Sequence, residues 1–382
     1  MTPHSMSIPA RRLAALLLAM APLLAMADGP YAWPEPGGGW TVRRVVETGG
    51  TPAARTETLT RDQAMVVDGS DGAPAFEVRL RAPADRAPDA LNVESDAPLF
   101  VVADIHGEYG ILVELLRHQG IIDAALRWNF GAGHLVFLGD AFDRGSHQVA
   151  VLWLVYQLQG EAEAAGGSVE FLLGNHELLA LRGDVRYLHP RYLADADALG
   201  VTTYAELFDA DSVLGQWLRT RGAILRAGDV LLAHGGISPQ VVQRDLSAAA
   251  LSRAVREVLD GRADSARPPL HDFAIGSSGP LWYRGYFARG AAAPEARAEE
   301  IEALRRHFGV RAILVGHTAL DEVSALFAGR VIGVQVYPAR DAGTGRAVMG
   351  AVRRDRGRWY RAAVNGDRSP LEIAPQPAES GT

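Results

Sequence analysis

The chain has 382 residues, which is enough for one large domain with additions or for two domains of about 150 residues each. Its 48% apolar and 22% charged residues are typical of a folded globular protein and exclude disordered, collagen-like and polytopic membrane chains. It contains no cysteine and no lysine, which excludes thiol nucleophiles, Walker A loops and Schiff-base lysines. The net charge of −7, without a basic block, argues against a nucleic-acid partner.

The first 27 residues have the pattern of a signal peptide. Arg11 and Arg12 precede an apolar run at residues 13–25, and the small-x-small sequence ending at Ala27 follows. The alternative is a permanent membrane anchor, but a spanning helix needs about 20 apolar residues and this shorter run contains Pro22. We therefore predict cleavage after Ala27, a periplasmic or secreted protein, and no stable membrane insertion afterwards.

Residues 28–98 are predicted to form a small β-rich extension followed by a linker. Two alternating or β-branched runs, residues 40–47 and 76–82, are typical of strands, and residues 81–98 have the Pro, Ala and Asp content of a linker. No chemistry is expected in this region.

Residues 99–364 are predicted to form an α/β domain, because short apolar runs alternate with helical patterns. The expected strands are residues 99–103, 134–138, 169–173, 230–233 and 312–315. The expected helices are residues 108–119, 146–159, 177–181 and 296–307. After residue 329 we expect an antiparallel meander, and residues 365–382 have the composition of a flexible tail.

Each of the five expected strands is followed by a polar cluster: DIHGEYG, GDAFDRG, GNHE, HGGIS and GHT, in chain order. In an α/β sheet, loops at the carboxyl ends of the strands meet in one place. We therefore expect six side chains from distant parts of the chain to converge: Asp104, His106, Asp140, Asn175, His234 and His317.

Carboxylate oxygens and imidazole nitrogens bind hard or borderline divalent metals, and the lack of cysteine excludes soft thiolate sites. Six donors are too many for a single catalytic ion with an open position. They suit two ions about 3.5 to 4 Å apart that share a carboxylate and a solvent molecule. We predict two divalent ions, with manganese as the first choice and iron or zinc as alternatives. A hydroxide bridging them is the strong nucleophile available to this composition.

The same clusters resemble the metallophosphoesterases, and the DRG and GNHE forms are similar to the phosphoprotein phosphatase branch typified by calcineurin and protein phosphatase 1. The stretches GNHELLALRGDVRYL and GPLWYRGY resemble the bacterial Shewanella-like phosphatases. The resemblance runs from about residue 99 to about residue 336. It implies a four-layer αββα sandwich, here with the β-rich N-terminal extension added. The family usually has Gly before the first Asp of these motifs, where this chain has Ala103.

The resemblance also implies how the donors divide between the ions. Asp104 and His106 hold one ion, while Asn175, His234 and His317 hold the other. Asp140 bridges the two.

Four further residues are predicted to bind the substrate or to assist the reaction. The resemblance implies that Arg144 binds phosphate and that His176 is the general acid, oriented by Asp143. The planar guanidinium of Arg144 suits two phosphate oxygens, and a leaving alkoxide needs a proton as its bond breaks. We expect Arg284 to be a second phosphate ligand, with Arg289 as the alternative. Asp143 and Arg144 can instead pair with each other to stiffen their turn.

Two other groups have alternative interpretations. Trp282, Tyr283 and Tyr286 either line a pocket for an aromatic ester or pack in the core. The charged residues after GNHE are more consistent with a structural ion-pair network than with catalysis: Arg182, Asp184 and Arg186.

The sequence thus predicts an exported, dinuclear-metal phosphomonoesterase, similar to protein Ser/Thr or Tyr phosphatases. Its substrates are expected to be phosphorylated proteins, peptides or small phosphoesters. One alternative is hydrolysis of dinucleoside tetraphosphates. Another is an inactive binding module of the same fold, but such a module commonly lacks a metal donor, and this chain has them all.

Overall fold

The computed structural model describes residues 26–48, 51–70, 72–81, 88–91, 93–261, 268–288 and 294–377. The apolar run of the predicted signal peptide lies outside these residues, as does Arg289. Of the first 27 residues only the last two are described, and they begin the first strand. Across the described ranges, no helix has the length and apolar character that crossing a membrane requires.

Two six-stranded sheets form the centre of the protein. The first has the order β19-β18-β17-β7-β8-β9, in which β7, β8 and β9 are parallel and the other three are antiparallel, with β17 and β18 in the expected meander. Its strands are β7 (Leu99–Val102), β8 (His134–Phe137), β9 (Ser168–Phe171), β17 (Gly350–Asp355), β18 (Arg358–Ala363) and β19 (Arg368–Pro370).

The second sheet has the order β13-β14-β12-β11-β10-β6, with β11, β12 and β14 parallel. Its strands are β6 (Ala90–Leu91), β10 (Ile224–Ala227), β11 (Val230–Ala233), β12 (Ala312–Val315), β13 (Ser324–Leu326) and β14 (Val331–Gly333).

Alternate residues of the central strands face two different apolar cores, as expected for strands buried on both faces. Leu99 and Val101 of β7 belong to the core shared with Leu232 of β11 in the other sheet. Phe100 and Val102 belong to the core shared with the helices. The two sheets are therefore stacked with helices outside them, and the predicted αββα sandwich is confirmed.

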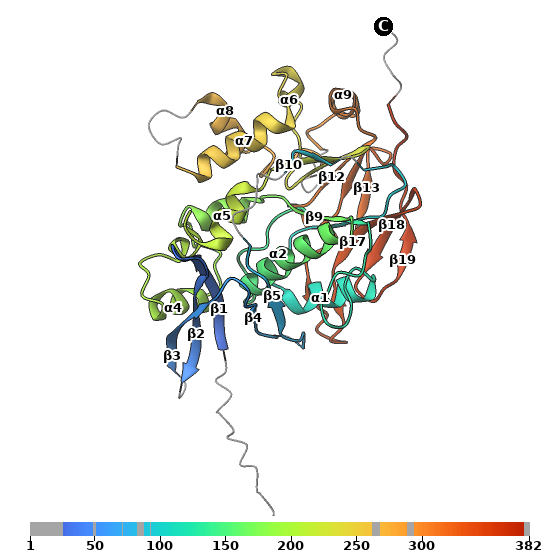
Figure 1. The fold of residues 1–382 in the computed structure, drawn as a ribbon. Coiled ribbons are helices and arrows are strands. Elements are labelled where there is room, and N and C mark those ends of the chain that lie inside the picture. The colour runs from blue at the N-terminus through green and yellow to red at the C-terminus, as the bar shows by residue number, and fades with distance from the viewer. Residues whose placement is uncertain are drawn as a thin grey trace, which may run out of the picture.

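Helices cover the outer faces of both sheets. Helix α2 packs against β9 and α7 packs against β10. In Figure 1, α6, α7 and α9 lie on the side of β10 and β12, and α1 and α2 lie on the side of the first sheet. The helices are α1 (Tyr109–His118), α2 (Gln148–Ala164), α3 (Asn175–Leu181), α4 (Arg191–Ala198), α5 (Val213–Thr220), α6 (Gln240–Gln243), α7 (Ala248–Leu259), α8 (Pro269–Ile275), α9 (Ala298–Phe308) and the 3₁₀ helix η1 (Tyr204–Phe208).

The N-terminal region is β-rich, as predicted, and packs directly on the α/β domain. Strands β1 (Met26–Pro34), β2 (Trp40–Thr48) and β3 (Thr51–Leu59) form an antiparallel sheet beside α4 and α5 (Figure 1). The indole N–H of Trp153 on α2 donates to the carbonyl oxygen of Pro30 at 2.7 Å. The small strand pairs are β4 (Met65–Val67) with β5 (Phe76–Val78), and β15 (Ala339–Arg340) with β16 (Ala347–Val348).

The structure differs from the sequence-based expectations at three segments. Ala90–Leu91, inside the expected linker, forms edge strand β6 and pairs in parallel with β10. Val331–Gly333 is not part of the meander, because it pairs with β12 in the second sheet. Arg368–Pro370, inside the expected flexible tail, pairs with β18. These short segments carry little pattern of their own, and each is stabilised by pairing with a neighbouring strand.

Candidate metal centre

The six predicted metal donors lie together at the carboxyl ends of strands in both sheets. Each is at most 5% exposed. Asp104 and His106 follow β7, Asp140 follows β8, and Asn175 begins α3 after β9. The remaining two, His234 and His317, follow β11 and β12 of the second sheet.

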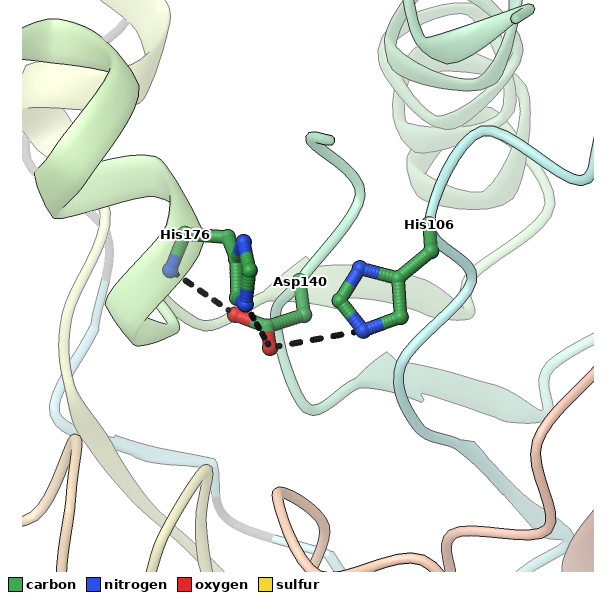
Figure 2. A group of neighbouring side chains, drawn as sticks. All are labelled: His106, Asp140 and His176. Carbon is green, nitrogen blue, oxygen red and sulfur yellow. Dashed lines mark hydrogen bonds and ion pairs between the residues drawn. The ribbon is translucent and has the colours of Figure 1, made fainter. Parts of the chain in front are cut away.

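Asp140 is at the centre of this group. Its Oδ2 atom is 3.8 Å from Nε2 of His106, 3.3 Å from Nε2 of His234 and 3.8 Å from Nε2 of His176. Figure 2 shows His106 and His176 on opposite sides of the Asp140 carboxylate. Two groups of side chains with metal-ligating atoms within 4.8 Å of one another share Asp140: one contains His106 and His176, the other His234 and His317.

In His106 and His234 the Nδ1 atom, on the side of the ring away from Asp140, is a hydrogen-bond donor. Nδ1–H of His106 donates to the carbonyl oxygen of Phe142 at 3.0 Å, and Nδ1–H of His234 donates to that of Leu138 at 2.7 Å. In a neutral imidazole this leaves Nε2 with a lone pair directed at the centre. These carbonyl contacts thus select the tautomer that can bind a metal.

The donors of the second group lie within hydrogen-bond distance of one another. Nε2 of His234 lies 2.9 Å from Oδ1 of Asn175 and 3.2 Å from Nδ1 of His317. With His234 and His317 as neutral rings that present lone pairs here, all three atoms are acceptors and repel unless a cation lies between them. The donor set therefore fits a divalent cation.

Asp104 is attached to this second group through the backbone. Its carboxylate accepts the N–H of His317, at 2.9 Å for Oδ2 and 3.2 Å for Oδ1. It is not in either of the two tight groups around Asp140. The structure thus brings Asp104 to the donor set as a buried residue, but outside the two groups whose ligating atoms lie within 4.8 Å of one another.

Burial and mutual charge set the protonation of the centre. Burial raises the pKa of Asp104 to about 7 and lowers those of His106 and His317 to about 4 and about 2. Burial also acts to raise the pKa of Asp140, but the facing imidazoles of His234 and the other histidines hold it well below its usual range. Burial acts to lower the pKa of His234, but the facing Asp140 and Asp104 carboxylates raise it to about 9. A field that favours a proton on His234 equally favours a metal cation in its place.

Several site residues have left-handed backbones, which non-glycine residues rarely adopt. The φ angles are 46° at Asp104, 47° at His106, 56° at Asp140 and 62° at His317. Each such residue costs about 1–3 kcal/mol and persists only where surrounding contacts impose it. The site therefore depends on supporting interactions that hold these turns.

The carboxylate of Glu177 provides such support. Its Oε2 accepts the backbone N–H of Asp140 at 2.8 Å and that of Gly174 at 2.7 Å. Its Oε1 accepts the N–H of Ala141 at 2.7 Å and that of Phe142 at 3.3 Å. Glu177 is fully buried and joins the loop after β8 to the start of α3. Sequence analysis did not assign this role, although a Glu three residues after Gly174 fits a helix N-terminal capping pattern.

The predicted acid and its orienting carboxylate are in direct contact. Nδ1–H of His176 donates to Oδ2 of Asp143 at 2.6 Å, and both side chains are buried. Burial acts to lower the pKa of His176, but the hydrogen bond to Asp143 and the charge of Asp140 raise it above its ordinary value. Asp143 thus pairs with His176, and the alternative pairing with Arg144 is not the one observed.

Arg144 lies on the exposed side of the centre between two tyrosines that sequence analysis did not single out. Its guanidinium carbon is 5.8 Å from the ring centres of both Tyr187 and Tyr337. The ring of Tyr337 stacks on that of His106 at 5.8 Å, and the ring of Tyr187 lies 5.2 Å from that of His176. No sequence signal distinguished Tyr337, which lies inside an expected strand, whereas Tyr187 is in a motif that carries the resemblance.

Arg284 reaches the opposite end of the donor set. Its guanidinium nitrogen lies 3.4 Å from Nδ1 of His317, and the ring of Trp282 stands perpendicular to that of His317 at 5.6 Å. Tyr283 and Tyr286 are buried and pack against each other. Trp282 therefore faces the site, while these two tyrosines belong to the core.

The charged residues after GNHE do not enter the site. Arg186 and Asp184 form an ion pair at 2.7 Å on the surface. Arg182 donates to the carbonyl oxygen of Val258. This arrangement agrees with the structural interpretation.

A two-sheet sandwich with Asp, His and Asn donors at its strand ends defines a metal-dependent phosphatase. Residues 97–321, more than half of the chain, match the family described as calcineurin-like phosphoesterase. The chain belongs to this family, so the predicted resemblance and enzyme class are confirmed.

Named relatives agree with this assignment. The chain is 26% identical over 308 residues to Shewanella-like protein phosphatase 2 of Arabidopsis thaliana, covering 69% of this chain and 77% of that protein. It is similar to the crystal structure of a cold-active protein-tyrosine phosphatase of a psychrophilic Shewanella species, with a TM-score of 0.77 and 33% identity over 90% of this chain and 99% of that chain. A segment is 29% identical over 152 residues to serine/threonine-protein phosphatase PP1-1 of Saccharomyces cerevisiae, covering 39% of this chain and 42% of that protein.

The buried contacts of Glu177 predict a large effect of Glu177→Gln. The new amide NH₂ would face two of the backbone N–H donors, and we expect a loss of about 3 kcal/mol in the free energy of unfolding because buried hydrogen bonds to charged groups are strong. Denaturant-induced unfolding of the purified protein measures this loss.

Glu206→Gln is the matched control. Glu206 accepts the N–H of Thr203 at 2.9 Å in the same helix-start pattern, but it is exposed. We expect a loss below about 1 kcal/mol there. Equal losses in both variants would contradict the role assigned to burial.

Proposed function

We propose that this protein is a dinuclear-metal phosphomonoesterase that acts on phosphorylated proteins, peptides or small phosphoesters. The observation that carries the proposal is the position of the Asp140 carboxylate, whose Oδ2 lies 3.8 Å from Nε2 of His106 and 3.3 Å from Nε2 of His234, with His317 beside His234. A single carboxylate between two sets of imidazoles suits two neighbouring cations.

In this proposal all six predicted donors hold the metals. Asp104 and His106 hold one ion, Asn175, His234 and His317 hold the other, and Asp140 belongs to both. Manganese remains the first choice, with iron or zinc as alternatives, because oxygen and nitrogen donors suit all three. When bound, the ions supply an activated water for attack on phosphorus and neutralise charge on the phosphate.

The protein's own side chains bind the phosphate and stabilise the leaving group. The guanidinium of Arg144 is exposed, flanked by two tyrosines, and can bind two phosphate oxygens at once. Arg284, beside His317, is placed to bind phosphate at the other end of the centre. His176 holds a proton at Nε2 for the leaving oxygen, while the Asp143 carboxylate fixes its ring.

For substrate class we propose that aryl phosphates such as phosphotyrosine are included. The relative of known structure that is 33% identical is described as a protein-tyrosine phosphatase. The rings of Tyr187 and Tyr337 beside Arg144 offer apolar faces to an aromatic ester. Because the chain contains no cysteine, any such activity proceeds without a thiol intermediate.

The activity is tested with purified protein reconstituted with manganese. We expect hydrolysis of phosphotyrosine and phosphoserine peptides, with little turnover of dinucleoside tetraphosphate. Asp140→Asn should lower turnover at least about 100-fold, because contacts between a carboxylate and a catalytic metal are worth several kcal/mol. Elemental analysis should show that metal content falls from two ions per chain.

Asp184→Asn is the control, since Asp184 pairs with Arg186 at the surface. It should keep both activity and metal content. Preferential turnover of the dinucleotide would favour the phosphoanhydride alternative, and no turnover of any ester would favour an inactive binding module. Unchanged metal content and activity in Asp140→Asn would overturn the dinuclear proposal.

The role of His176 predicts an effect that depends on the leaving group. His176→Asn should slow hydrolysis of a serine phosphate by about 10²- to 10⁴-fold, the range for loss of a general acid. It should slow nitrophenyl phosphate much less, because nitrophenolate leaves without a proton. Steady-state kinetics with both esters measures the ratio, and equal slowing of both removes His176 from the acid role.

We also propose that the protein is exported and processed after Ala27, as the signal-peptide pattern of residues 1–27 indicates. The mature chain would then begin at Asp28 and keep most of β1. N-terminal sequencing of the protein recovered from an exporting bacterial host should begin at Asp28. Residues before Asp28 in the mature material would refute the proposal.

A further inference from the structure

The backbone of Asp143 is held by a buried side chain outside the catalytic motifs. The N–H of Asp143 donates to Oε1 of Gln148 at 2.7 Å, and Gln148 is fully buried at the start of α2. Its backbone N–H donates to the hydroxyl of Tyr192 at 2.9 Å. Because an N–H donor faces its oxygen, the side-chain amide of Gln148 has one orientation, with Oε1 towards Asp143.

The nitrogen of the same amide makes a hydrogen bond on the side away from Asp143. Nε2–H of Gln148 donates to the hydroxyl oxygen of Tyr204 at 2.7 Å, and this oxygen lies 3.4 Å from the hydroxyl of Tyr31. Tyr31 is a residue of β1 and is 1% exposed. A buried polar chain thus runs from the N-terminal sheet to Asp143, and Tyr31 lies outside the residues that match the family.

An aromatic cluster accompanies this polar chain. The ring of Phe142, the residue before Asp143, lies 5.0 Å from that of Phe208, and Phe208 lies 5.7 Å from Tyr31 and 5.4 Å from Tyr204. All of these rings are buried. The two routes give the N-terminal sheet both polar and apolar contact with the turn that carries Asp143.

This turn requires support. Asp143 and Arg144 have φ angles of 70° and 66°, so two consecutive non-glycine residues are left-handed. Oδ1 of Asp143 has no hydrogen-bond partner among the described residues, while Oδ2 contacts His176. The Asp143 carboxylate is therefore positioned mainly through the backbone of Asp143, and Gln148 is the side chain that holds this backbone.

We propose that Gln148 and Tyr204 are positioning residues for the Asp143–His176 pair, and that Tyr31 of the N-terminal sheet completes their support. This inference rests on the proposed function, in which His176 protonates the leaving group. The N-terminal sheet is then part of the catalytic unit.

The test is whether loss of this support has the effect expected for His176→Asn, which is to slow hydrolysis of a serine phosphate much more than that of nitrophenyl phosphate. Gln148→Met keeps the side-chain length and removes the acceptor of Asp143. We expect hydrolysis of a serine phosphate to fall about 10- to 100-fold, a part of the contribution of a positioned general acid, while nitrophenyl phosphate changes little. Tyr204→Phe and Tyr31→Phe should give the same pattern with smaller losses, in that order.

Two buried residues provide matched controls. Gln157→Met changes a glutamine of the same helix whose Oε1 accepts the N–H of Arg79, away from the site. Tyr109→Phe removes the hydroxyl of a buried tyrosine that stacks on Phe76. Both controls should leave the ratio of the two rates unchanged.

A second readout does not require activity. The proton between His176 and Asp143 should give a downfield imidazole resonance in the proton NMR spectrum, identified by its loss in His176→Asn. It should shift or broaden in Gln148→Met and Tyr204→Phe, and persist in both controls.

The outcomes separate the two proposals. If the wild type hydrolyses neither ester, the proposed function fails and the resonance alone decides the positioning role. Equal slowing of both esters, or an unchanged resonance in the variants, overturns the inference. If Gln148→Met does not fold by circular dichroism, Tyr204→Phe and Tyr31→Phe decide it by the same measurements.

Discussion

The buried carboxylate of Glu177 holds together the two loops on which the metal centre depends. It accepts four backbone N–H groups, from Gly174 at the start of α3 and from three consecutive residues after β8. One of those three is Asp140, which has an unfavourable left-handed backbone and faces three imidazoles. Without this anchor, neither the strained turn nor the position of the shared carboxylate would be maintained.

The centre is stable in this form because its charges are balanced by their surroundings. Backbone carbonyls orient His106 and His234, so that their Nε2 atoms face the Asp140 carboxylate and can bind a cation. Positive charge towards solvent comes from arginine alone, since the chain contains no lysine. Arg144 and Arg284 lie at opposite ends of the donor set. Arg144 contacts the ring of Tyr337, which stacks on His106, and Arg284 contacts His317 directly. In the proposed mechanism this arrangement separates the buried metal donors from the more exposed arginines that would bind phosphate.

Much of the fold and site could be predicted from the sequence, because the motifs lie directly after strands with strong apolar patterns. The positions of Asp140 and His176 follow from that regularity. Tyr337 and Gln148 could not be predicted, since each acts through a tertiary contact with a distant residue and neither lies in a distinctive local pattern. The edge strand at 90–91 was missed for the same reason: two residues have no measurable periodicity, and their structure is imposed by pairing with β10.

The extent of the catalytic unit is determined by packing and not by the span of the recognisable motifs. The family match begins at residue 97, yet Tyr31, Val42 and Val45 of the N-terminal sheet belong to the same apolar core as Phe142, next to Asp143. Trp153 of α2 also donates a hydrogen bond to β1. Removing this sheet would expose apolar surface of α2 and η1, the elements that carry Gln148 and Tyr204. In the proposed mechanism the sheet therefore contributes to the geometry of the acid, although none of its described residues is assigned a catalytic role.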